Sequence, residues 1–247
     1  MKVTVIGFWG AYPGAGEATS GYLVEHDGFK LLVDCGSGVL SSLQRYIDVQ
    51  ELDAVILSHY HHDHIADIGP LQYAMLIKKT LGITDKTLPI YGHTEDTQAF
   101  EKLTHHDNTL GIAYGPDKPL SLGPFTITFT KTSHPVPCYA MRFEVNGETF
   151  VYTADSSYQE SFCDFAKDAD LLISECSFYA DQDGAKAGHM NSHDAATVAE
   201  KAGASLLLLS HLPHFGEHEQ LLKEAKTKYM GNVQLASTGW TWLEQGQ

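Results

Sequence analysis

The chain has 247 residues, of which 43% are hydrophobic, so it can bury a large core and we expect a single domain over residues 1–247. Its 31 acidic residues against 16 Lys and Arg give a formal net charge of −15. This balance disfavours binding to long nucleic acids and to an anionic membrane surface. The chain has no signal-peptide pattern and no apolar run of membrane length, and its four cysteines lack C-x-x-C spacing. We therefore expect a cytoplasmic protein with reduced thiols.

The first half of the chain predicts strands followed by alternating helices and strands. Short apolar runs predict strands at 3–8, 21–25 and 29–34, and His26-Asp27-Gly28 predicts a hairpin turn. Helical spacing of apolar residues follows at 39–46, 68–81 and 94–103, with strands expected at 54–58 and 88–91.

The second half repeats this order. Strands are expected at 125–132, 138–145 and 148–153, with a hairpin turn at Asn146-Gly147. Further strands at 171–176, 205–210, 233–236 and 240–243 alternate with helices at 192–202 and 217–229. This repeated order predicts an α+β fold in which two mixed sheets pack together with helices outside.

A histidine-rich segment follows the buried run at 54–58. It reads His59-Tyr60-His61-His62-Asp63-His64, an H-x-H-x-D-H pattern. Imidazoles and a carboxylate suit a borderline divalent cation such as zinc. Four ligands in six residues are too crowded to close around one ion, so the pattern predicts two ions that need further ligands from elsewhere.

Three further candidate ligands follow apolar, strand-like runs. His134 follows 125–130, Asp155 follows 150–153, and His211 follows 206–210. Each alone is a weak signal, because such residues often cap turns. Together with the 59–64 segment they provide the ligands that a two-metal site requires.

This ordered set of residues resembles the metal-binding motifs of the metallo-β-lactamase superfamily. Asp34, at the end of the third expected strand, resembles the carboxylate that supports the ligands in that fold. The resemblance runs from residue 3 to about 243 and implies a four-layer αββα sandwich. It also implies that His59, His61 and His134 hold one metal, that Asp63, His64 and His211 hold the other, and that Asp155 bridges them.

Within the superfamily, the segments at 174–178 and 188–192 resemble the ribonuclease Z group. The resemblance implies that Glu175 orients His189, which donates a proton to the leaving oxygen, and we count Asp63 with these two as catalytic. Two departures stand out. Ser174 replaces the usual His, and the long arm that grips transfer RNA has no counterpart here.

These residues predict a hydrolase that uses two divalent ions, zinc or alternatively manganese, and a metal-bridging hydroxide. We expect a phosphodiesterase that acts on a small or short nucleotide-type anionic substrate, because a proton from His189 helps most with a poor alkoxide leaving group. Hydrolysis of a carboxylic ester, lactone or thioester at the same site is an alternative. A non-hydrolytic di-iron protein or an inactive metal-binding protein is an alternative of another class. A homodimer is left open.

Four other residues lie close to these motifs or in a loop after a strand. His62 lies between ligand positions, so we expect its side chain to point away from the metals. His214, Trp9 and Tyr12 are candidates to line a substrate pocket, because loops after strands often border a site.

Overall fold

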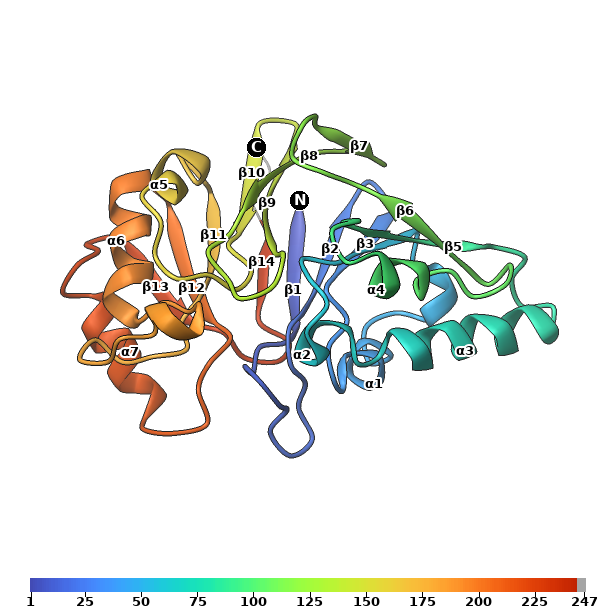
Figure 1. Ribbon diagram of the computed structural model, residues 1–247, viewed down its shortest axis with the longest axis horizontal. Helices are drawn as coiled ribbons and strands as arrows, with labels where there is room; N and C mark the ends of the chain where they lie inside the picture. The colour runs from blue at the N-terminus through green and yellow to red at the C-terminus, as the bar shows by residue number, and fades with distance from the viewer. Residues whose placement is uncertain (244–247) are drawn as a thin grey trace. The chain divides into compact units, whose positions relative to one another are not determined.

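The computed structural model describes residues 1–243. They form two compact units, Met1–Gly115 with the segment from Thr238, and Pro116–Ser237. Each unit contains one seven-stranded mixed sheet with its own helices (Figure 1). The single domain expected from composition stays a prediction.

The first sheet has the strand order β14-β1-β2-β3-β4-β5-β6. Strands β14 to β3 pair antiparallel, and β3 to β6 pair parallel. The expected hairpin between β2 and β3 is present, with Asp27 and Gly28 at φ of 48° and 83°. The bounds are β1 Lys2–Gly7, β2 Gly21–His26, β3 Phe29–Val33, β4 Ala54–Ile56, β5 Leu88–Gly92, β6 Thr109–Ala113 and β14 Thr241–Leu243.

Helices pack on this sheet through a continuous apolar core. Leu32 and Val55 of the sheet, Leu43 of α1, and Leu71 and Met75 of α3 are all fully buried in one cluster. The helices of this unit are α1 Val39–Leu43, the 3₁₀ turn η1 Val49–Glu51, α2 His62–Ile65, α3 Ile68–Thr80 and α4 Thr97–Glu101.

The second sheet repeats this plan, with the strand order β13-β12-β11-β10-β9-β8-β7. Strands β7 to β10 pair antiparallel, and β10 to β13 pair parallel. Asn146 and Gly147 form the expected turn between β9 and β10, both with positive φ. The bounds are β7 Leu120–Leu122, β8 Phe125–Lys131, β9 Tyr139–Val145, β10 Glu148–Tyr152, β11 Leu171–Glu175, β12 Leu206–Ser210 and β13 Asn232–Leu235.

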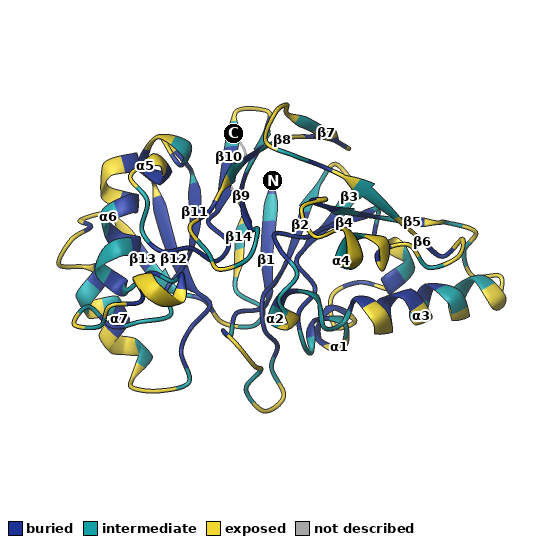
Figure 2. Cartoon of the chain, in the orientation of Figure 1, coloured by how far each residue is buried: buried dark blue, intermediate teal, exposed yellow. Residues whose placement is uncertain are grey.

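The helices of the second unit are α5 Ser161–Phe165, the 3₁₀ turn η2 Ala185–Ala187, α6 Ser192–Ala202 and α7 His218–Ala225. Helix α6 has the bounds predicted from sequence. It begins at a capping box formed by Asn191 and Asp194 and ends at Gly203 in the left-handed region, with φ of 66°. Figure 2 shows that α6 and α7 are exposed on one side, whereas β11 and β12 are buried along their whole length.

Some elements differ from the sequence prediction. The helices expected at 39–46, 94–103 and 217–229 are shorter, and strands β6 and β7 and helices α2 and α5 were not predicted. These missed elements have three to five residues, too few for a periodic pattern to show. Among residues 1–243, no helix is long and apolar enough to cross a membrane.

Candidate metal centre

In the first unit, the histidine-rich segment leaves β4 and runs into α2. His59 and His64 are buried, His61 and Asp63 are partly buried, and His62 is exposed. That His62 points away from the metals stays a prediction, which its exposure supports. We call His59, His61, Asp63 and His64, with Asp34 and Ser58, the N-terminal half-site.

Asp34 and Ser58 determine how the two buried histidines of this half-site are oriented. Asp34 is fully buried, and its carboxylate accepts hydrogen bonds from the Ser58 N–H at 2.7 Å and from the Ser58 hydroxyl at 2.8 Å. The same carboxylate lies 2.7 Å from Nδ1 of His64. Nδ1 of His64 is therefore the donor, and its Nε2 carries the lone pair that a metal requires.

Ser58 also sets the tautomer of His59. Its single hydroxyl proton goes to Asp34, so the contact of 3.0 Å between the Ser58 oxygen and Nδ1 of His59 has the imidazole as donor. His59 therefore also presents Nε2 as a lone-pair atom. One buried carboxylate thus sets the tautomers of both histidines.

The geometry of this half-site fits metal ligation. Nε2 of His59 lies 3.1 Å from Nδ1 of His61. Two nitrogen ligands of one tetrahedral zinc ion are about 3.3 Å apart, because each lies about 2.0–2.1 Å from the metal. Asp63 and His64 form a second pair, with Oδ2 and Nε2 3.8 Å apart, and the Ala11 N–H donates to the same Asp63 oxygen at 2.9 Å.

In the second unit, three strand ends bring the other candidate ligands together. His134 follows β8, Asp155 follows β10 and His211 follows β12. Oδ2 of Asp155 lies 3.4 Å from Nε2 of His211 and 4.0 Å from Nε2 of His134. One carboxylate oxygen thus faces two imidazoles, an arrangement that suits a bridging ligand. We call His134, Asp155 and His211, with Glu175, Ser177 and His189, the C-terminal half-site.

The tautomer and the pKa of His134 both suit a neutral metal ligand. Its Nδ1 donates to the carbonyl oxygen of Gly188 at 3.0 Å, which leaves Nε2 with the lone pair. Burial lowers the pKa of His134 below its usual value, against the opposing effect of Asp155. Gly188 has φ of 80°, and a Cβ there would collide with His134 and Pro135.

The buried carboxylate of Glu175 is the centre of the C-terminal half-site. Its Oε1 accepts the N–H groups of Ser156 and Met190 and lies 3.0 Å from Nδ1 of His189. Its Oε2 accepts the N–H of Ser177 at 3.2 Å and the Ser177 hydroxyl at 2.9 Å. These contacts hold the His189 imidazole with Nδ1 as donor and Nε2 facing away from Glu175.

Ser177 connects this carboxylate to a candidate ligand. Its hydroxyl donates to Glu175 and lies 2.9 Å from Nδ1 of His211, so His211 is the donor and presents Nε2. The arrangement matches that of Asp34, Ser58 and His59 in the other unit. Each half-site therefore contains a buried carboxylate at a strand end, a serine whose hydroxyl donates to it, and two histidines that the carboxylate and the serine orient.

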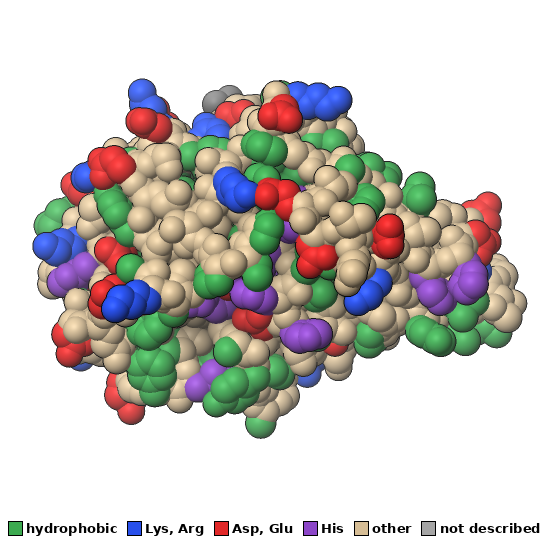
Figure 3. Space-filling model, in the orientation of Figure 1, with side chains coloured by type: hydrophobic (Ala, Val, Ile, Leu, Met, Phe, Trp, Pro, Cys, Tyr) green, Lys and Arg blue, Asp and Glu red, His purple; other side chains and the backbone are tan. Residues whose placement is uncertain are grey.

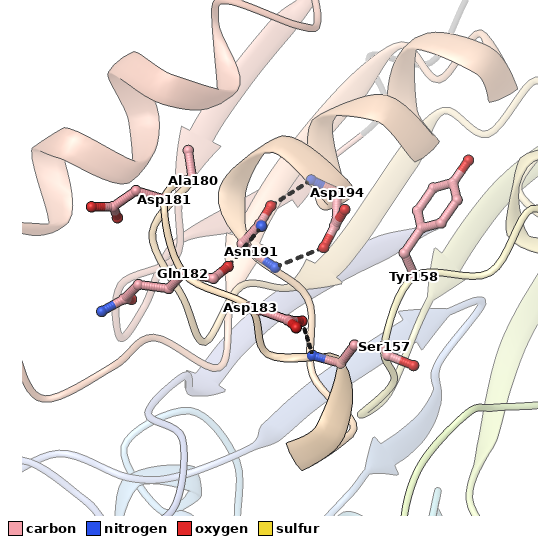
Figure 4. A pocket seen from close by; sticks show the side chains of 9 residues that line it. Ser157, Tyr158, Ala180, Asp181, Gln182, Asp183, Asn191 and Asp194 are labelled. Carbon is pink, nitrogen blue, oxygen red and sulfur yellow. Dashed lines mark hydrogen bonds between the residues drawn. The ribbon is translucent and has the colours of Figure 1, made fainter.

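The loop that carries His189 is anchored at the start of α6. Asn191 accepts the N–H of Asp194 at 2.9 Å and donates from its side chain to the carbonyl of Gln182 at 3.0 Å (Figure 4). This loop borders a cavity of about 450 Å³ whose charged lining is Asp181, Asp183 and Asp194. Its negative charge does not suit an anionic substrate.

The expected contact between Glu175 and His189 is present, and the seven candidate ligands stay a prediction as a metal-binding set, whereas Ser58 and Ser177 had no role assigned from the sequence. The signal available was only that Ser58 directly precedes the candidate ligand His59 and that Ser177 lies two residues after Glu175. Tyr12 is 58% exposed, and Nε1 of Trp9 donates to Glu17. His214 is partly buried, and its place in a pocket stays a prediction, as do those of Trp9 and Tyr12.

The chain is similar to known proteins along most of its length. A family model described as a β-lactamase superfamily domain matches residues 30–212. YhfI of Bacillus subtilis (strain 168), a probable metallo-hydrolase, is 63% identical over 98% of this chain and 99% of its own length. The crystal structure of YhfI, a metallo-β-lactamase fold protein, matches with a TM-score of 0.97 at 62% identity over 98% of each chain. A ribonuclease Z of Haloarcula marismortui is 28% identical over 97% of this chain and 95% of its own.

Proposed function

This chain belongs to the β-lactamase superfamily and has the metallo-β-lactamase fold, and on that premise we propose that it hydrolyses a small or short phosphodiester of nucleotide type. We assign the chain to the metallo-hydrolases, because YhfI, which is 63% identical to it, is described as a probable metallo-hydrolase. We propose in addition which bond is cleaved, which metal is bound and which class of substrate is used.

We propose that two divalent ions, zinc by preference, are held by ligands drawn from both half-sites. His59, His61 and His134 would hold one ion, Asp63, His64 and His211 the other, and Asp155 would lie between them. Four of the five histidines already present Nε2 because Nδ1 is hydrogen bonded. The bound ions would lower the pKa of the attacking water and stabilise the negative charge that develops on the phosphoryl oxygens.

The observation that carries the choice of a phosphodiester is the contact between His189 and Glu175. The side chain of His189 is 18% exposed and that of Glu175 is 1% exposed, so a buried carboxylate accepts the Nδ1–H of a partly exposed imidazole. A proton at Nε2 of His189 can pass to a leaving oxygen. Such a donor matters most for an alkoxide such as a ribose oxygen, which leaves poorly without a proton.

The acidic chain supports a small substrate. The ribonuclease Z of Haloarcula marismortui is a relative whose name refers to RNA, but the net charge here is −15. Long RNA would meet more carboxylates than cations. We also propose a cytoplasmic location, supported by four buried free cysteines.

Replacing His189 with Ala tests the proposal. We expect the variant to keep its metals and to lose about 10²–10⁴ in rate on a dialkyl phosphodiester, the contribution typical of a general acid. The loss should be under about tenfold on bis(p-nitrophenyl) phosphate, because nitrophenolate leaves without a proton. Glu175→Gln should act in the same direction more mildly.

His193→Ala is the matched control, since its Nε2 contacts the hydroxyl of Thr227 and not Glu175. It should leave both rates unchanged. Equal losses on both phosphodiesters in His189→Ala, or loss of a metal, would show that His189 is structural or a ligand. Hydrolysis of carboxylic esters in preference to phosphodiesters would favour the ester-cleaving alternative.

A further inference from the structure

A row of aromatic rings extends from His189 toward the surface of the second unit. The ring of Phe178 lies 6.3 Å from that of His189, measured between centroids, and 6.5 Å from that of Phe215. Phe178 is partly exposed and Phe215 is 48% exposed. Two apolar rings are therefore open to solvent, and that of Phe178 lies beside the proposed proton donor.

Tyr179 holds the outer ring in place. Its own ring is buried and lies 5.9 Å from Phe215, and its hydroxyl donates to the Phe215 carbonyl at 3.0 Å. Two glycines make room for the row, since a Cβ at Gly184 would overlap the ring of Phe178 and one at Gly216 would overlap that of Tyr179. Both exposed rings are thus packed against neighbouring residues of the same unit.

The charge around the outer ring limits what can bind there. Phe215 and Tyr179 line a cavity of about 670 Å³ that also contains the carboxylates of Asp181, Glu217, Glu219 and Glu224. Lys223 is the one cation that lines it. Carboxylates repel a phosphate, but they accept hydrogen bonds from N–H groups. A neutral planar group with amino donors fits this surface.

We propose that Phe178 and Phe215 bind the nucleobase of the leaving nucleoside of a phosphodiester substrate. This inference rests on the proposed function and names the group on the leaving side. In the reaction, the oxygen of water bonds to phosphorus and the proton that the water loses passes to solvent. The bond from phosphorus to the leaving oxygen breaks, that oxygen takes the proton of His189, and His189 regains a proton from solvent. Phe178 adjoins His189 and Phe215 adjoins Phe178, so the nucleoside bonded to that oxygen would extend from His189 over the two rings. Stacking on an aromatic face suits every base.

Two substrates that differ only in the leaving group test the inference. When the bond from phosphorus to the 5′ oxygen of adenylyl-(3′→5′)-adenosine breaks, the leaving group is adenosine, whereas when the corresponding bond of the methyl ester of adenosine 3′-monophosphate breaks, it is methanol; the products identify the bond that is cleaved. With Phe215→Ala we expect KM for the dinucleotide to rise about tenfold while kcat changes less than about twofold, because the ring contributes to binding and not to proton transfer. KM for the methyl ester should stay unchanged, and Phe215→Tyr should restore the original KM for the dinucleotide.

Tyr73→Ala is the matched control, since Tyr73 is an aromatic residue of α3 that is 62% exposed. It should leave KM for both substrates unchanged. An equal rise in KM for both substrates in Phe215→Ala, or none for either, would overturn the inference.

A binding measurement separates this inference from the proposed function. In equilibrium dialysis of adenosine against the metal-loaded protein, Phe215→Ala should weaken binding at least about fivefold relative to the native chain and to Tyr73→Ala. If the native chain cleaves neither diester, the proposed function is wrong, and the dialysis still decides whether the rings bind a base. Adenosine binding that is the same in all three proteins would overturn the inference by itself.

Discussion

At the scale of single residues, the two half-sites have the same arrangement of hydrogen bonds. A buried carboxylate, Asp34 or Glu175, accepts a serine hydroxyl, and that serine accepts Nδ1–H of a histidine. The carboxylate also accepts Nδ1–H of a second histidine. The serines carry no charge and contact no substrate in the proposed reaction, but they decide which imidazole nitrogen faces the metal.

Ser177 should therefore control metal affinity. We expect Ser177→Ala to weaken the binding of one zinc ion about 10–100-fold, because Nδ1 of His211 loses its acceptor and the ring loses its orientation. Competition with a chromophoric chelator measures this. Ser177→Thr should restore affinity by returning the hydroxyl.

Ser174→Ala is the control, since its hydroxyl donates to the backbone carbonyl of Glu175 and not to the carboxylate. If Ser174→Ala and Ser177→Ala bind zinc equally well, the serine does not orient His211.

At the scale of elements, strand ends place the functional side chains. Asp34 and His211 are the first residues after β3 and β12, and both have positive φ, 57° and 53°. Ala154, just before Asp155 and two residues after β10, has φ of 51°. This conformation costs a non-glycine residue about 1–2 kcal/mol, which the surrounding hydrogen bonds must offset. It turns the chain sharply, so side chains that would alternate across the sheet gather at its edge.

Loss of the cap at the N-terminus of α6 should lower both the stability of the protein and its catalytic rate. Asn191→Ala removes the cap from that helix, so we expect the free energy of unfolding in urea to fall by about 1 kcal/mol. It also frees the carbonyl of Gln182 in the loop that carries His189, so kcat on a dialkyl phosphodiester should fall as well.

Asp96→Ala is the matched control, because Asp96 caps α4 of the other unit by accepting the N–H of Ala99 at 3.0 Å. It should cost stability of the same order and leave kcat unchanged. A loss of kcat as large in Asp96→Ala as in Asn191→Ala would mean that the cap of α6 has no specific part in positioning His189.

At the scale of the whole molecule, the distribution of charge predicts which partners are disfavoured. The chain has two arginines, and one of them, Arg142, donates from Nε and Nη2 to Glu144. The pair Lys78-Lys79 is the densest basic segment, and Lys79 lies 3.2 Å from Asp107. On the face drawn in Figure 3, Lys and Arg side chains are scattered among acidic ones and form no continuous basic surface. The homodimer left open by the sequence stays a prediction.

We expect binding to transfer RNA and duplex DNA to be no tighter than non-specific, with Kd above about 10⁻⁶ M at physiological salt, because few phosphates would be neutralised. Filter binding over a series of salt concentrations measures both the affinity and its salt dependence. Tight binding that falls steeply with salt would mean that local charge outweighs the net charge of −15.

The sequence by itself determined the family, the two sheets and the candidate ligands, because these depend on local patterns and on residue types that follow apolar runs. Only the tertiary structure decided how those ligands are oriented. Glu175 pairs with Ser210 in the register of β11 with β12, which brings Ser177 beside His211, 34 residues away. The ring of Phe215 meets that of Phe178 across a similar separation. Contacts of this kind depend on strand order and register, and these are set by packing of the whole sheet and not by any short segment.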